Sequence, residues 1–175
     1  MINNKILKKI KKSKFNSLFK QLDWIILNFG DSIKYSLHVA CNVRICHRDK
    51  VVLNTSDEFF TKEGIQKTEE VYERLEKEGF IYDPDSLLAE NIKKVNKLLD
   101  GKTPRRVKVS KWKDLIIKFA DQIEIQIIPD CLERDYEYYR FIEFIPHYND
   151  DPLKCTSIHY VVCNDQGVPK LKIDQ

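Results

Sequence analysis

The clearest hydrophobic pattern in the chain lies between residues 33 and 46, where every odd position is apolar. These positions are Ile33, Tyr35, Leu37, Val39, Cys41, Val43 and Ile45. Strict alternation over this length predicts one long strand with one face on the core and the other open to water. Leu22–Phe29 before it and Val51–Leu53 after it are also predicted strands. Residues 22–53 therefore predict a three-stranded meander.

Helical spacing appears in three other segments. The start, from Asn3 to about Lys14, predicts a short basic helix with one apolar side. A second helix is predicted from about Thr61 to Glu78, with a glutamate-rich outer face and four inward side chains. These inward residues are Ile65, Val71, Tyr72 and Leu75.

The third helix is predicted from about Asp85 to Leu99, because Asp85 or Ser86 can cap its first turn. Its apolar residues fall on one stripe. They are Leu88, Ile92, Val95 and Leu99.

The second half of the chain returns to short strand patterns. The predicted strands are 106–109, 114–119, 122–128, 137–145, 157–163 and 168–173. Runs of strands around a helical pair, with hairpin-length connections, are typical of the α+β class. We therefore predict a single α+β domain over residues 1–175. It should have a mostly antiparallel β-sheet, two central helices and a short basic N-terminal helix.

Composition agrees with one globular domain that needs no covalent or metal support. The 175 residues are 42% hydrophobic and 33% charged, enough apolar material for a core. The five cysteines are odd in number and show no CxxC spacing, unlike a disulfide framework or a zinc site. No signal-peptide pattern or membrane-length apolar run is visible. We expect a cytoplasmic protein with no membrane partner and reduced thiols.

Charge is segregated along the chain although the net charge is only +3. Residues 1–20 carry seven lysines and no acid, and residues 91–120 carry ten bases against two acids. Residues 57–90 carry eleven acids against four bases, and residues 121–152 nine acids against two bases. Such blocks can form separate positive and negative patches on the folded surface.

Catalytic motifs are sparse. Asp114 and Glu124 occupy a predicted hairpin in an order loosely similar to metal-dependent nucleases, but Gln126 stands where such a site needs a lysine. No P-loop, GxGxxG, GxSxG or HExxH sequence is present. We therefore expect no enzyme activity, no catalytic residue, no metal and no cofactor. A cryptic metal-dependent nuclease remains an alternative.

Two kinds of interaction surface remain open. The basic clusters 5–14 and 102–113, the second of which surrounds Trp112, suit phosphate contact and base stacking. The acidic, tyrosine-bearing segment Glu133–Tyr148 suits a basic protein partner. Its expected partner-binding residues, with the adjoining loop, are Asp135, Glu137, Tyr138, Tyr139, Asn149, Asp150 and Asp151. Glutamates on the predicted 61–78 helix give a second acidic surface.

The stretch from Leu37 to Arg44 reads Leu-His-x-x-Cys-x-x-Arg and follows Phe29-Gly30. It resembles a family of small uncharacterised bacterial proteins with this motif, and residues 138–144 and 159–162 are similar to that family's C-terminal half. The chain departs from the pattern at Asn42-Val43, where a Pro-Trp pair is expected, and in its lysine-rich start. The resemblance implies a place in toxin–immunity gene clusters.

Our leading hypothesis is a non-enzymatic binding module, an immunity protein that neutralises a basic, nuclease-type protein toxin by occlusion. The first alternative is a nucleic-acid-binding protein that uses clusters 5–14 and 102–113.

Overall fold

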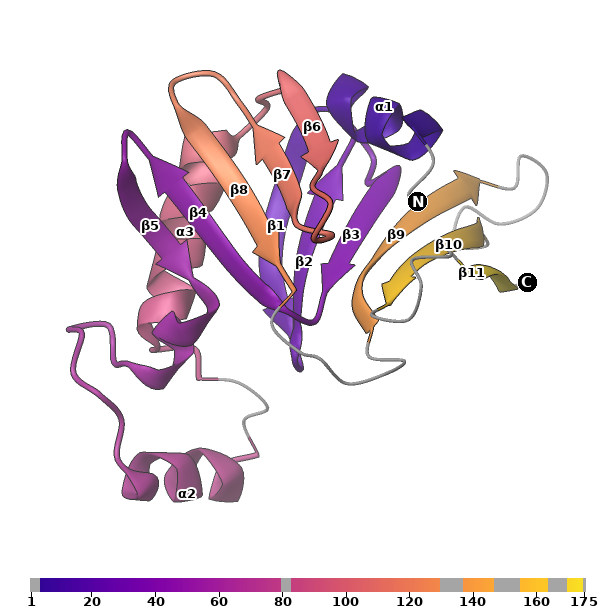
Figure 1. Ribbon diagram of the computed structural model, residues 1–175. Coiled ribbons are helices and arrows are strands. Elements are labelled where there is room, and N and C mark those ends of the chain that lie inside the picture. Colours follow the sequence, from indigo (N-terminus) through magenta and orange to yellow (C-terminus); the bar gives the residue numbers. More distant parts are fainter. Residues whose placement is uncertain (1–3, 80–82, 130–136, 147–154, 164–169, 175) are drawn as a thin grey trace.

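The computed structural model describes residues 4–79, 83–129, 137–146, 155–163 and 170–174 (Figure 1). In this part of the chain, three α-helices and one 3-10 helix accompany two antiparallel sheets. The α+β class predicted from the sequence is confirmed.

The larger sheet has six strands in the order β1-β2-β3-β9-β10-β11. Their bounds are β1 Phe15–Gln21, β2 Trp24–Phe29, β3 Tyr35–Val39, β9 Glu137–Pro146, β10 Cys155–Cys163 and β11 Lys170–Asp174. At the centre of this sheet, β3 from the first part of the chain pairs with β9 from the last part, and Leu37 lies opposite Phe141.

The smaller sheet has five strands in the order β5-β4-β8-β7-β6. Their bounds are β4 Asn42–His47, β5 Lys50–Asn54, β6 Arg106–Val109, β7 Leu115–Lys118 and β8 Ile123–Ile128. In β8 the isoleucines at positions 123, 125 and 127 are buried. The inner faces of both sheets contribute to one continuous hydrophobic core.

The single long strand predicted for residues 33–46 is wrong, because the chain bends at Ala40-Cys41 and passes from one sheet to the other. Strand β3 pairs with β2 and β9, whereas β4 pairs with β5 and β8. The predicted three-stranded meander is therefore divided between the sheets. At the bend, the Ala40 amide donates to the Tyr138 carbonyl at 2.9 Å. A strand that changes sheets in this way keeps its inward side chains inward.

Helix α3, Leu87–Leu99, lies across one open side of the two sheets and contacts both edge strands β1 and β5 (Figure 1). Its predicted cap and stripe are confirmed: the Ser86 hydroxyl accepts from the Ala89 amide, and the four predicted stripe residues are buried. The Asn96 side chain both accepts from the Leu18 amide and donates to the Leu18 carbonyl. These bonds occupy backbone groups on the outer edge of β1, which would otherwise be open to pairing.

Helix α1, Asn4–Lys12, contacts β6, the opposite edge of the smaller sheet. Ile6 and Ile10 are buried and Leu7 packs against the core. The predicted basic N-terminal helix with one apolar side is confirmed. Strand β1, which follows it, was not predicted.

Candidate protein-docking site

Residues 55–79 and 83–86 belong to a projection that leaves the body of the molecule and returns to it (Figure 1). It begins with the 3-10 helix η1, Thr55–Phe59, and carries helix α2, Glu69–Lys77, at its far end. A capping box between Asn54 and Asp57 starts η1. The Asp57 carboxylate also accepts from the Asn91 side chain of α3 at 2.9 Å, which fixes η1 to the body.

The predicted helix 61–78 is too long. Of its four predicted inward residues, Val71 and Leu75 are half-buried, whereas Ile65 and Tyr72 are exposed. Helix α2 has no buried residue. Ile65, which precedes it, is 66% exposed and Tyr72 is 40% exposed. Residues 60–67 instead make backbone contacts at the base of the projection, where Phe60 bridges to Gln66 and Thr61 bridges to Ser86.

Backbone hydrogen bonds hold the outgoing and returning chains together at this base. The Lys67 amide donates to the Phe59 carbonyl at 2.9 Å, and the Leu87 amide donates to the Phe60 carbonyl at 2.9 Å. The Lys62 amide donates to the Asp85 carbonyl at 3.2 Å. These backbone hydrogen bonds join residues 59–67 to one another and to residues 83–87, and we call this joined base the neck.

A buried ion pair completes the neck. The Lys67 Nζ atom lies 2.6 Å from Asp83 Oδ2, and the two side chains are 1% and 11% exposed. Burial opposes the charge of Asp83, but hydrogen bonds from Lys67 and from the Asp85 amide lower the pKa of Asp83 below its ordinary value. A buried pair with well-placed hydrogen bonds fixes geometry, because either charge alone would be strongly unfavourable there.

Helix α2 presents an acidic surface, and the projection also carries exposed apolar side chains. Residues 69–78 contain five glutamates against Arg74 and Lys77. Glu69, Glu73 and Glu76 share a face, because residues three and four apart lie one above another on a helix. Exposed Phe59, Ile65 and Tyr72 belong to the same projection.

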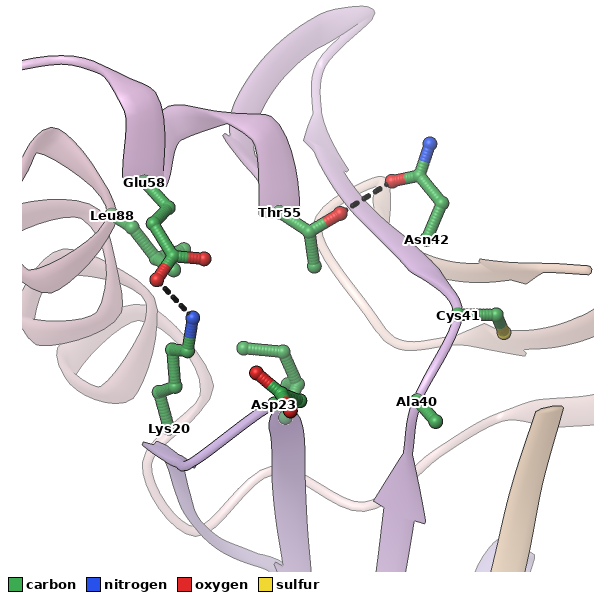
Figure 2. Close-up of a pocket in the computed structure, with 9 residues that line it drawn as sticks. Lys20, Asp23, Ala40, Cys41, Asn42, Thr55, Glu58 and Leu88 are labelled. Atoms are coloured by element: carbon green, nitrogen blue, oxygen red, sulfur yellow. Dashed lines mark hydrogen bonds and ion pairs between the residues drawn. The ribbon is translucent and has the colours of Figure 1, made fainter. Parts of the chain in front are cut away.

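A pocket of about 180 Å³ lies where the projection joins the body (Figure 2). Lys20 and Glu58 form an ion pair across it, and the Thr55 hydroxyl donates to Asn42 Oδ1 at 2.7 Å. Asp23 also lines it. With Lys20 and Glu58 cancelling, Asp23 leaves this pocket one net negative charge. Such a pocket suits a cationic head group.

The pocket and helix α2 are electrostatically linked. The pKa of Tyr72 is raised by burial and then by the negative charges of Glu58, from the pocket, and Asp83, from the neck. We call this projection, with its acid-rich helix α2 and the pocket of net negative charge at its base, the acidic projection.

The structure places the expected partner-binding segment differently. Tyr138 and Tyr139 are 3% and 1% exposed, because β9 lies in the middle of the larger sheet and both of its faces are covered there. Their rings pack inside the domain, which corrects the expectation that they form a surface. Glu137 is half-buried and accepts from Arg140 Nη2 at 2.9 Å. Asp135, Asn149, Asp150 and Asp151 lie outside the described residues.

The nuclease alternative gains no support from the hairpin geometry. Leu115 pairs with Ile127 and Lys118 pairs with Glu124. Asp114 and Glu124 thus lie at opposite ends of the β7–β8 ladder, four residues or about 13 Å apart along the strands. Glu124 lies 2.6 Å from Lys118. Within the described ranges, no three His, Cys, Asp or Glu side chains are grouped to hold a metal ion.

Comparisons with protein-family models, curated proteins and solved structures find no match for this chain. No helix in the described part of the chain is long and apolar enough to cross a membrane. The candidate site therefore has to be judged from its own geometry.

Sequence reasoning noted the glutamates of α2 but missed Lys67, Asp83, Asp23 and Glu58. The available signal was the excess of acids over residues 57–90. That signal could not show that one lysine and one aspartate within it are buried as a pair.

Proposed function

We propose that the chain is a protein-binding module that holds a basic protein against the acidic projection. The observation that carries the proposal is an acid-rich helix without a buried residue, presented on a neck that contains a buried ion pair. A helix that packs on no core contributes little to folding. A role in binding a partner protein would explain why helix α2 is nevertheless held in place by the neck.

The surface has the features of a docking site for a cationic partner. Exposed aromatic and apolar side chains supply contact area, and the surrounding carboxylates speed the approach of a basic protein and disfavour acidic ones. The pocket beside η1, with its net negative charge, would receive a lysine or arginine side chain of that partner.

The partner we propose is a toxin of the nuclease type, and the role of the chain is immunity by occlusion. A nuclease binds phosphates through a basic active site. An acidic projection that occupies this site would exclude the nucleic acid substrate. The choice of a toxin as the partner comes from the sequence resemblance of Leu37–Arg44 and is the part of the proposal that the capture experiment below tests.

The test compares three tagged proteins. One is unchanged, one carries Glu73→Lys with Glu76→Lys, and one carries Asp31→Lys with Asp100→Lys. Both variants change charge by the same amount at exposed positions, but only the first lies on α2. The Glu73–Lys77 pair it removes is 4.0 Å long and exposed, so helix α2 should persist.

Each protein is used to capture partners from nuclease-treated lysate of the organism that encodes it. We expect one basic protein to be retained by the unchanged protein and the Asp31/Asp100 variant, and lost by the Glu73/Glu76 variant. The same variant should fail to protect cells that express the captured protein. Capture and protection that survive the Glu73/Glu76 substitutions would show that the acidic projection is not the docking surface.

A further inference from the structure

Two basic segments that are far apart in the sequence meet at the end of the molecule opposite α2 (Figure 1). Helix α1 contacts strand β6. Because the apolar side of α1 is buried, Lys8, Lys11 and Lys12 remain exposed. On β6, Val107 and Val109 pack against the core, while Arg106 and Lys108 alternate with them and are exposed.

Strand β6 runs directly into a turn that presents an exposed tryptophan. Trp112 is 71% exposed, and Lys111 Nζ lies 4.8 Å from the centre of its ring. The turn is ordered by Ser110, whose hydroxyl accepts from the Trp112 and Asp114 amides and donates to the Asp114 carboxylate at 2.8 Å.

The turn is also fastened to the core. The buried Tyr139 hydroxyl donates to the Lys113 carbonyl at 2.9 Å. An indole held in water on such a turn loses little conformational freedom when a flat ligand stacks on it. The bonds that fix the turn explain its shape, but they do not explain why it carries an exposed tryptophan.

Carboxylates close to this surface are already engaged. Glu143 pairs with Lys9, Asp121 with Lys102 at 2.7 Å, and Glu124 with Lys118. Each of these three carboxylates therefore has its charge offset by a lysine, whereas the Asp114 carboxylate in the Trp112 turn accepts from the Ser110 hydroxyl.

We propose that α1, β6 and the Trp112 turn form a second surface, the basic face, which binds single-stranded nucleic acid. Lysine and arginine side chains hold the phosphates, and Trp112 stacks on an unpaired base. Stacking on an exposed aromatic ring requires a base that is free of a duplex, which is why the single-stranded form is favoured. This surface shares no residue with the acidic projection, so each proposal can fail without the other.

The experiment follows the fluorescence anisotropy of labelled oligo-dT and oligo-U while the full chain is added. If Lys8, Lys11, Lys12, Arg106 and Lys108 each neutralise one phosphate, the logarithm of the affinity falls with the logarithm of salt at a slope of about −3.5. Raising salt from 50 to 200 mM should then weaken binding by roughly 100-fold.

Variants separate stacking from charge. Trp112→Ala should weaken binding by roughly tenfold without changing the salt slope, since stacking is not ionic. Arg106→Gln with Lys108→Gln should make the slope shallower by about 1.4. The matched control is Lys93→Gln with Lys94→Gln on α3, where the side chains are 69% and 62% exposed; it should bind like the unchanged protein.

Several results would overturn the proposal. One is no binding at ~100 µM protein in low salt, where even non-specific binding is measurable. Equal affinity of Trp112→Ala and the unchanged protein would remove the stacking role. Equal losses in the β6 and α3 charge variants would show a general charge effect. Sedimentation with phosphatidylserine vesicles in the absence of oligonucleotide binding would assign the basic face to an anionic membrane surface.

Discussion

Replacing Lys67 by methionine should open the acidic projection while leaving the core folded. The methionine keeps most of the apolar stem but removes the charge that faces Asp83. Asp83, 11% exposed, would then retain the hydrogen bond from the Asp85 amide at 2.9 Å without a counter-charge. Breaking a buried pair in this way costs about 3–5 kcal/mol. We expect the lower value, because Asp83 keeps that bond and some contact with water.

The free-energy cost of losing the Lys67–Asp83 pair should appear as local opening of the neck. Helix α2 has no buried residue, so the projection can separate from the body without exposing the core. A loss of about 3 kcal/mol corresponds to a roughly 100-fold loss of hydrogen-exchange protection. It should affect the Thr61 and Lys67 amides, which donate to carbonyls within the neck. Amides of β4 and β8 should keep their protection.

Acidification should have opposite effects on the stability of the neck in the unchanged protein and in the Lys67→Met variant. In the unchanged chain the pKa of Asp83 is lowered. Its contribution to stability is therefore complete above the ordinary pKa of about 3.9 and is lost as the pH falls through the lower folded value. In Lys67→Met, burial without a counter-charge should raise the Asp83 pKa. Acidification then protonates an unpaired carboxylate and reduces the defect.

Hydrogen exchange of peptides from residues 60–79 checks both statements when it is measured at pH 7, near pH 4 and at a pH below the ordinary pKa of aspartate. Lys77→Met, which removes a lysine whose side chain is 80% exposed, is the matched control and should exchange like the unchanged protein. Adding Asp83→Asn to Lys67→Met should restore much of the protection, because neither charge remains. Protection of the neck amides that survives in Lys67→Met would refute the structural role of the pair.

Three further perturbations test the core and its connections. Asn96→Ala removes both hydrogen bonds to Leu18 and should lower the free energy of unfolding by about 2 kcal/mol in a denaturant titration. Leu37→Ala, at a position 1% exposed, should cost about 3 kcal/mol in the same assay, whereas Leu37→Asp should prevent folding. Tyr139→Phe removes the bond to the Lys113 carbonyl and should cost about 1 kcal/mol. Burial raises the pKa of Tyr139, so alkaline absorbance of the unchanged protein should lack this phenolate until the fold opens.

The sheet-changing strand shows what hydrophobic alternation can and cannot predict. The buried odd positions through residues 35–45 were predicted because both sheets face the same interior, and the bend at Ala40 leaves that side unchanged. The bend itself leaves no mark in the pattern. The bend depends on β9, which lies almost a hundred residues later in the chain. The Tyr138 carbonyl of β9 accepts a hydrogen bond from the Ala40 amide.

Strand β1 was not predicted because its hydrophobic residues do not alternate with a period of two. Phe15 and Leu18 are buried three positions apart, and Phe19 is 39% exposed. The register of β1 against β2 shifts between Phe15 and Ser17. Such an irregularity adds a residue on one strand and moves the following side chains to the other face.

The candidate docking site was only partly predictable, because its acids differ in environment and not in type. Glu73 is largely exposed, whereas Asp83 is mostly buried against Lys67. A run of charged residues in the sequence is compatible with both arrangements. Only the tertiary contacts of the neck distinguish a carboxylate that holds the projection from one that is free to meet a partner.

This difference also determines which substitutions are informative about function. Changing Asp83 or Lys67 should weaken partner binding indirectly, because the neck would open and the α2 surface would lose its fixed position. Changing Glu73 and Glu76 alters the surface itself and leaves the neck intact. Loss of partner binding with preserved neck protection in the Glu73/Glu76 variant would therefore assign recognition to α2. Parallel loss of both would show that the substitutions had acted through the fold.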